Sequence, residues 1–224
     1  AADTAGGSAK DAPAEGTPAQ RTIWETVKHH FAVSACILQK DAKIGKIIGF
    51  YSVVFAAHTL LFFYSQQYFA DFGYNKVQIS VIMLLVGGAS CLGALASEKM
   101  YRRFGKRCLI PETVIIAAAI LCYGSGKAGV AAAALMCAGF ANAALYPIQS
   151  DSLNALIPSE QRATLISVDS MCFSIAMIVL FPLAGALADR WGLKTVLLLL
   201  GAILLLFLLT VFCIEKESFS SDHS

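Results

Sequence analysis

The sequence predicts an all-α, polytopic membrane protein whose six transmembrane helices form two inverted three-helix repeats. Hydrophobic residues make up 57% of the 224 residues and charged residues only 14%, and the mean hydropathy is +0.67. A typical soluble protein is about a quarter charged, so too few charges remain here to cover a water-facing surface. Apolar stretches of membrane-spanning length occur six times, and one short segment recurs after three of them. This composition argues against a soluble enzyme, a disordered protein and a nucleic-acid binder.

The first 43 residues differ from the rest of the chain. Residues 1–21 are small and polar, contain Pro13 and Pro18, and lack the apolar core of a signal peptide, so we expect a flexible cytoplasmic linker. Because the chain starts at Ala1 rather than Met, we also expect it to be a fragment of a longer protein. Residues 22–43 carry apolar side chains at helical spacing, which predicts an amphipathic helix at the membrane interface. A helix on a soluble partner's surface is the alternative.

Residues 44–214 are predicted to form the six-helix transmembrane bundle. A spanning helix needs about 20 mostly apolar residues, and helices suit such stretches because lipid cannot satisfy a bare backbone. We expect residues 215–224 to be a cytoplasmic tail. The six predicted spans are residues 47–70, 77–97, 108–126, 128–150, 163–188 and 195–214.

Lysine and arginine in the loops predict the orientation of the bundle. If the N-terminus is cytoplasmic, that side holds 13 of the 17 basic residues, and the other side holds four: Lys76, Lys127, Arg190 and Lys194. We therefore expect both termini in the cytoplasm and the protein in the bacterial inner membrane.

Two segments of the chain echo each other. Residues 93–107, GALASEKMYRRFGKR, follow the second span, and residues 185–194, GALADRWGLK, follow the fifth. The offset of 92 residues corresponds to three spans, so the second copy is inverted relative to the first. Inverted three-helix repeats are typical of secondary transporters.

The second segment resembles the loop motif G-x-L-a-D-R-x-G-x-K of the major facilitator superfamily. The residues that match are Gly185, Leu187, Ala188, Asp189, Arg190, Gly192 and Lys194. The first copy departs from the motif at Ser97 and Glu98, where the family's Asp would stand. It keeps Gly93, Leu95, Ala96, Arg102, Arg103, Gly105, Lys106 and Arg107. Residues 157–167 also resemble the segment that opens helix 11 in many members.

The resemblance covers residues 22–214 and implies the C-terminal six-helix half of such a transporter, equivalent to helices 7 to 12. It implies that helices 7 and 10 face a central cavity, that 8 and 11 flank it, and that 9 and 12 lie outside. The partners that it implies are membrane lipid, the missing N-terminal half, a small-molecule substrate and protons. We expect no cofactor, no metal and no nucleic acid.

Polar residues inside the spans are the candidate site residues, because burying them in lipid is costly. Asn142, Tyr146 and Gln149 share one face of the fourth span, which indicates either the lining of a cavity or an interhelical hydrogen-bond seam. His58 lies near mid-membrane in the first span, as a proton carrier or as a neutral hydrogen-bonded histidine, and Gln66 lies nearer the outer end.

Charged residues near the fifth span are candidates for coupling or gating. Asp169 lies about two helical turns after Arg162, where it can pair with a cation, hold a coupling proton or satisfy a helix contact. Asp151 and Arg162 flank the same cytoplasmic loop, so we expect an ion pair that belongs to the inner gate. We also expect Gly87, Gly88 and Gly93 to allow close helix packing.

The predicted function is secondary active transport of a small organic solute by alternating access, as symport or antiport. The alternative is a six-helix membrane binding or scaffold protein without a transport cycle. An enzyme is not expected, because the Gly124–Lys127 stretch lacks the pattern of a phosphate loop and no cluster of metal ligands occurs.

Overall fold

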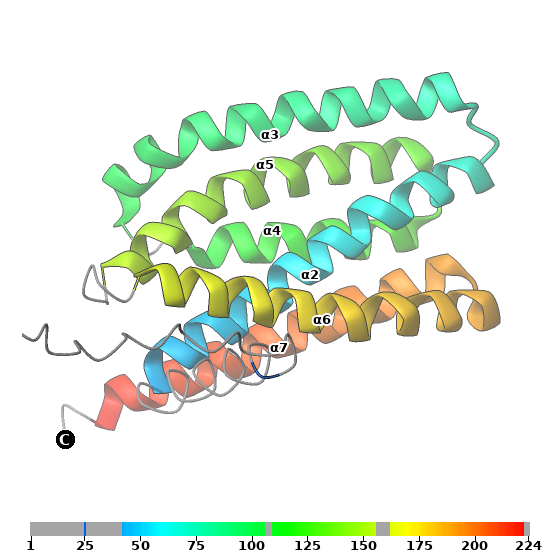
Figure 1. The fold of residues 1–224 in the computed structure, drawn as a ribbon. Helices are drawn as coiled ribbons and strands as arrows, with labels where there is room; N and C mark the ends of the chain where they lie inside the picture. Colours follow the sequence, from blue (N-terminus) through cyan, green and yellow to red (C-terminus); the bar gives the residue numbers. More distant parts are fainter. Residues whose placement is uncertain (1–24, 26–41, 106–108, 156–161, 222–224) are drawn as a thin grey trace, which may run out of the picture.

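The computed structural model describes residue 25 and residues 42–105, 109–155 and 162–221 (Figure 1). The predicted linker, nearly all of the predicted interfacial helix, and residues 157–161 of the family-like segment lie outside the described residues.

Six α-helices account for almost all of the described chain, which confirms the prediction of an all-α polytopic protein. They are α2 (Ala42–Asp71), α3 (Lys76–Phe104), α4 (Leu109–Cys122), α5 (Ala128–Asn154), α6 (Arg162–Trp191) and α7 (Leu193–Ser221), and a 3₁₀ turn, η2 (Tyr123–Ser125), extends α4. Five helices are long and apolar enough to cross a membrane, whereas the apolar helix Leu109–Ser125 is shorter. The last helix continues beyond residue 214, where the predicted span ends.

Local sequence signals define the helix ends. At the start of α3, the Asn75 side chain accepts a hydrogen bond from the Gln78 N–H at 2.9 Å, and the Gln78 side chain accepts one from the Asn75 N–H at 2.9 Å. Gly105 and Gly192, which belong to the two copies of the loop motif, end α3 and α6 with φ of 58° and 82°. Glycine adopts a positive φ without a steric penalty, so each copy of the motif ends its helix at a residue that suits the turn.

Three of the helix contacts follow the pattern that two inverted repeats predict. If α2–α4 form one repeat and α5–α7 the other, then α2 corresponds to α5, α3 to α6 and α4 to α7. The contact between α3 and α5 then corresponds to the contact between α6 and α2, and the contact between α4 and α7 corresponds to itself. All three contacts are extensive, and Figure 1 shows α3 lying along α5. The central helices α2 and α5 hold most of the buried residues, while α3 and α6 are the least buried of the five long helices.

Glycines bring α3 and α5 into backbone contact. A Cβ atom at Gly93 would collide with the carbonyl group of Phe140, and one at Gly139 would stand 2.8 Å from the Ser90 Oγ. The expected packing role therefore holds at Gly93. It is wrong at Gly87 and Gly88, where an added Cβ would meet nothing within 4 Å.

Tyrosine side chains of α2 attach its C-terminal half to two neighbours. The Tyr68 hydroxyl donates to the Tyr123 carbonyl at 2.9 Å, which holds the end of the short α4. The Tyr64 hydroxyl donates to the Phe181 carbonyl of α6 at 3.1 Å, and the two rings stack at 5.2 Å.

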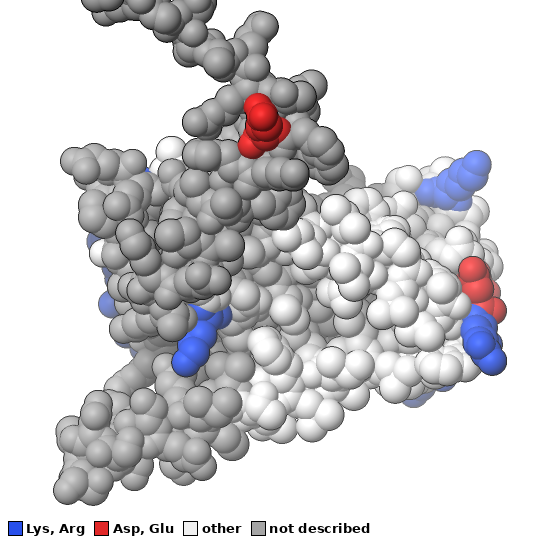
Figure 2. Space-filling view, turned by 60° about the horizontal axis from the view of Figure 1, so that its bottom comes forward, with Lys and Arg blue, Asp and Glu red and all other residues white. Residues whose placement is uncertain are grey.

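The outer surface is suited to lipid. Large apolar side chains are exposed along α6 and α7, including Ile178, Leu183, Ile203 and Leu206. Figure 2 shows an uncharged surface between charged side chains that lie towards the two ends of the molecule. This distribution is the one expected of a bundle that crosses a hydrocarbon layer.

Candidate functional site

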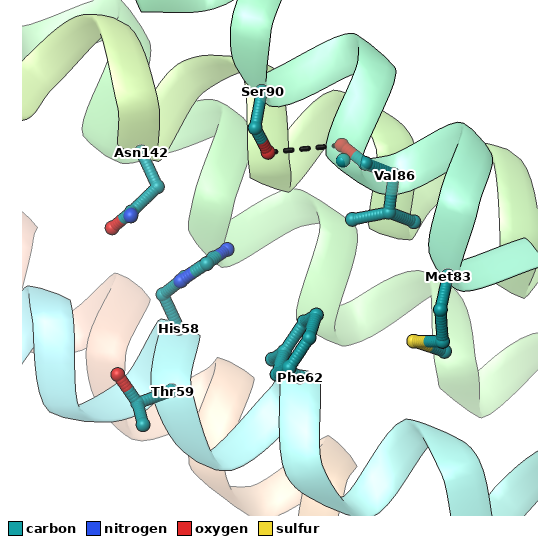
Figure 3. A pocket seen from close by; sticks show the side chains of 8 residues that line it. His58, Thr59, Phe62, Met83, Val86, Ser90 and Asn142 are labelled. Atoms are coloured by element: carbon teal, nitrogen blue, oxygen red, sulfur yellow. Dashed lines mark hydrogen bonds between the residues drawn. The ribbon is translucent and has the colours of Figure 1, made fainter. Parts of the chain in front are cut away.

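A pocket of about 350 Å³ lies between α2, α3 and α5. His58, Ser90 and Asn142 contribute to it, and each of them lies near the midpoint of its helix. The pocket is therefore placed near half the depth of a membrane that these helices would cross. Its full lining consists of His58, Thr59, Phe62, Met83, Val86, Gly87, Ser90 and Asn142 (Figure 3).

Two buried polar atoms of the pocket have no hydrogen-bond partner among the described residues, the His58 Nε2 and the Asn142 Oδ1. The hydroxyl groups of Thr59 and Ser90 are already used. They donate to backbone carbonyls of their own helices, at 2.7 Å to Phe55 and at 2.9 Å to Val86. Because buried polar groups in native proteins are nearly always hydrogen-bonded, the two unpaired atoms mark a place where a polar guest would be stabilised.

The predicted polar stripe of α5 divides between two roles. Asn142 lines the pocket, whereas Gln149 is buried and its Nε2 donates to the Asp169 Oδ1 of α6 at 3.4 Å. The Tyr146 side chain is exposed, and its ring lies 5.8 Å from that of Phe55. Both alternatives considered for the stripe thus occur, the cavity lining at Asn142 and the interhelical hydrogen bond at Gln149.

A comparison with protein-family models matches residues 47–222 to the Major Facilitator Superfamily. The chain belongs to this family. Comparisons with curated proteins and with solved structures found no match. The family match covers nearly the whole six-helix bundle, so the protein is a membrane transporter of the Major Facilitator Superfamily.

The two candidate gating residues, Asp151 and Arg162, flank the segment that joins α5 to α6 in this transporter of the superfamily. Asp151 is exposed near the end of α5, and Arg162 is exposed at the start of α6. Within the described part of the chain, no ion pair joins them. Their proposed gating role stays a prediction.

The two copies of the superfamily loop motif lie at opposite ends of the bundle. In the first copy, Arg102 pairs with Glu98 at 2.6 Å on the exposed surface of α3, and the Arg103 guanidinium lies over the Phe104 ring. In the second copy, Asp189 and Arg190 are exposed in the last turns of α6. Lys194 lies in the first turn of α7, and its side chain packs against Gly126. Its Nζ is 3.1 Å from the position that a Cβ atom on this glycine would take.

Gln66 lies outside the pocket. Its side chain is exposed on the outer half of α2, one turn beyond the pocket residue Phe62. A role for Gln66 in the solute site stays a prediction.

Sequence reasoning missed the α3 wall of the pocket. Ser90 lies one turn after Val86 and one turn before Gly93, which is the glycine that faces α5. The spacing of these three residues was the available signal, because positions three and four apart share a helix face. A second missed feature is Glu112, which is 1% exposed and has no hydrogen-bond partner for either carboxyl oxygen among the described residues.

Proposed function

We propose that this chain is the C-terminal half of a secondary transporter that moves a small organic solute by alternating access, as a symporter or antiporter. The observation that carries the proposal is the mid-depth pocket with its unpaired His58 and Asn142 atoms. Membership of a transporter family supports it further. In transporters built from inverted repeats, the substrate site lies near the bilayer midplane, which is the depth of this pocket.

The proposed solute site has two walls. The pocket of α2, α3 and α5 provides one wall, and a preceding six-helix half provides the other. In this arrangement residues 1–21 and 22–43 join the two halves on the cytoplasmic side of a bacterial inner membrane, and both termini of the chain are cytoplasmic. Rocking of the halves about the site then exposes it to one side at a time.

The proposed coupling group lies apart from the solute site. Asp169 is hydrogen-bonded to Gln149, which follows Asn142 by seven residues, or about 10 Å along α5 towards its cytoplasmic end. We assign the coupling proton to Asp169 and the inner gate to Asp151 and Arg162.

The first experiment replaces Asn142 by leucine in the full-length protein, with transport measured across a panel of solutes. Leucine has nearly the same size but no polar atoms, so we expect kcat/KM for the transported solute to fall by about tenfold, the effect of one lost hydrogen bond. The amount of protein in the membrane stays the same.

Gln67→Leu provides the matched control. Gln67 is exposed on α2, and its amide bonds only to Asp71 among the described side chains, at 2.7 Å. We expect wild-type transport from this variant. Wild-type transport by Asn142→Leu would contradict the assignment of the pocket, and solute binding without net flux in the unmodified protein would favour a scaffold without a transport cycle.

A further inference from the structure

The residues that line the pocket indicate the charge of the solute that it binds. None of its lining side chains is an aspartate, glutamate, lysine or arginine. An ion that enters the pocket loses its hydration and finds no aspartate, glutamate, lysine or arginine on this wall to offset the loss. The lining therefore selects against carboxylates, phosphates and ammonium groups.

The hydrogen-bonding capacity of the pocket is equally specific. The Asn142 Oδ1 accepts and has no donor among the described residues. Thr59 and Ser90 give their protons to their own helices and thus offer only lone pairs to a guest. A guest therefore needs at least one O–H or N–H group to satisfy the Asn142 Oδ1.

Apolar side chains make up the rest of the lining. Figure 3 shows His58, Thr59 and Asn142 on one side of the pocket and Met83 and Val86 on the other. Phe62 of α2 lies between these two groups. A guest that fits both sides has a polar head and an apolar or aromatic body. The volume of about 350 Å³ is enough for such a molecule with one or two rings.

We infer that the pocket binds an uncharged, amphipathic solute whose hydroxyl or carboxamide group donates a hydrogen bond to the Asn142 Oδ1 and pairs with the His58 Nε2, while its apolar body packs on Phe62, Met83 and Val86. The inference rests on the proposed function, because it names the substrate class of the same site.

Three probes of equal size and different charge test this inference: benzamide, benzoate and benzylammonium. Binding is measured on the purified full-length protein as the rise in melting temperature with probe concentration. We expect benzamide to raise the melting temperature and the two ions to leave it unchanged.

Variants locate the bound probe. Asn142→Leu removes the acceptor, so we expect it to weaken benzamide binding by about five- to tenfold. Gln67→Leu, on the exposed face of α2, leaves binding unchanged. His58→Phe keeps the size of the side chain and removes its ring nitrogens, and we expect a similar loss.

The results that overturn the inference differ from those that overturn the proposed function. Stabilisation by benzoate or benzylammonium equal to that by benzamide overturns the inference, as does an undiminished benzamide effect in Asn142→Leu or no benzamide effect at all. If Asn142→Leu still impairs transport in that case, the pocket remains the solute site and only the substrate class is wrong.

Discussion

The candidate polar residues lie at two different depths along the helices. His58 and Asn142 place unpaired atoms at the middle of the helices, whereas Gln149 and Asp169 join α5 to α6 near the end of α5 and the start of α6. The carboxylate therefore does not line the solute pocket. In the proposed function, the solute and the coupling proton therefore bind at different depths and do not touch each other, so their coupling is indirect.

Replacing Asp169 by asparagine tests the coupling role. The amide still forms a hydrogen bond with Gln149 but cannot exchange a proton. We expect downhill flux of solute to persist and its acceleration by a pH gradient to disappear. The measurement is flux through the full-length protein in proteoliposomes, with and without the gradient.

Asp71→Asn is the matched control for this change, because Asp71 is exposed at the outer end of α2. It should respond to the gradient as the unmodified protein does. If Asp169→Asn also responds fully, the coupling proton is held elsewhere.

Pairs of helices form the next level of organisation. The α3–α5 pair depends on close approach at two glycines, at Gly93 to the Phe140 backbone and at Gly139 to the Ser90 and Val86 side chains. The attachment of α6 is different, since it combines the hydrogen bond from Tyr64 to Phe181, the bond between Gln149 and Asp169, and a small apolar cluster near the start of α6. Such side-chain contacts rearrange more readily than backbone contact.

Two glycine variants compare an occupied and an open position on α3. Gly93→Ala places a methyl group against the Phe140 carbonyl, so we expect a loss of about 1–3 kcal/mol of stability. Gly88→Ala meets open space and gains helix propensity, so we expect no loss, or a gain of up to about 1 kcal/mol. Thermal unfolding of the full-length protein measures both, and equal melting temperatures would argue against the tight crossing.

At the scale of the whole molecule, the charges define two ends. Lys99, Arg102 and Arg103 lie at the end of α3, where both chain termini are expected, while Lys76 and Lys127 lie at the opposite end of the bundle. The excess of basic residues at the first end predicts that it faces the cytoplasm.

Cysteine labelling tests this orientation in intact cells. In a full-length background without the seven native cysteines of this chain, we expect Lys76→Cys to react with a membrane-impermeant maleimide added outside. We expect Lys99→Cys to react only after the membrane is permeabilised. The reverse pattern would show that the bundle is inserted the other way up.

Much of this architecture could be predicted from the sequence. The length of the apolar stretches determines the helices, since lipid leaves the backbone few alternatives, and the repeated loop segment indicates how they pair. His58 and Asn142 were identified because a polar group is conspicuous in an apolar span. Gln66 satisfied the same criterion and lies outside the pocket, because exposure depends on which helices pack nearby.

The α3 wall of the pocket and the burial of Glu112 could not be predicted in this way. Ser90 is a small residue whose hydroxyl bonds to its own helix. Burying it in a span therefore costs little free energy, and its presence in the sequence does not indicate a site. Glu112 is buried in α4, which packs chiefly against α5 and α7, two helices that follow it in the chain.

The glycine crossing described above has a consequence for how the pocket changes size. Ser90 and Asn142 belong to the two helices in backbone contact, so the distance between them is nearly constant. His58 belongs to α2, which touches α3 only sparsely. In the proposed site, α3 and α5 thus form the closely packed wall, and a displacement of α2 relative to α3 would change the size of the pocket.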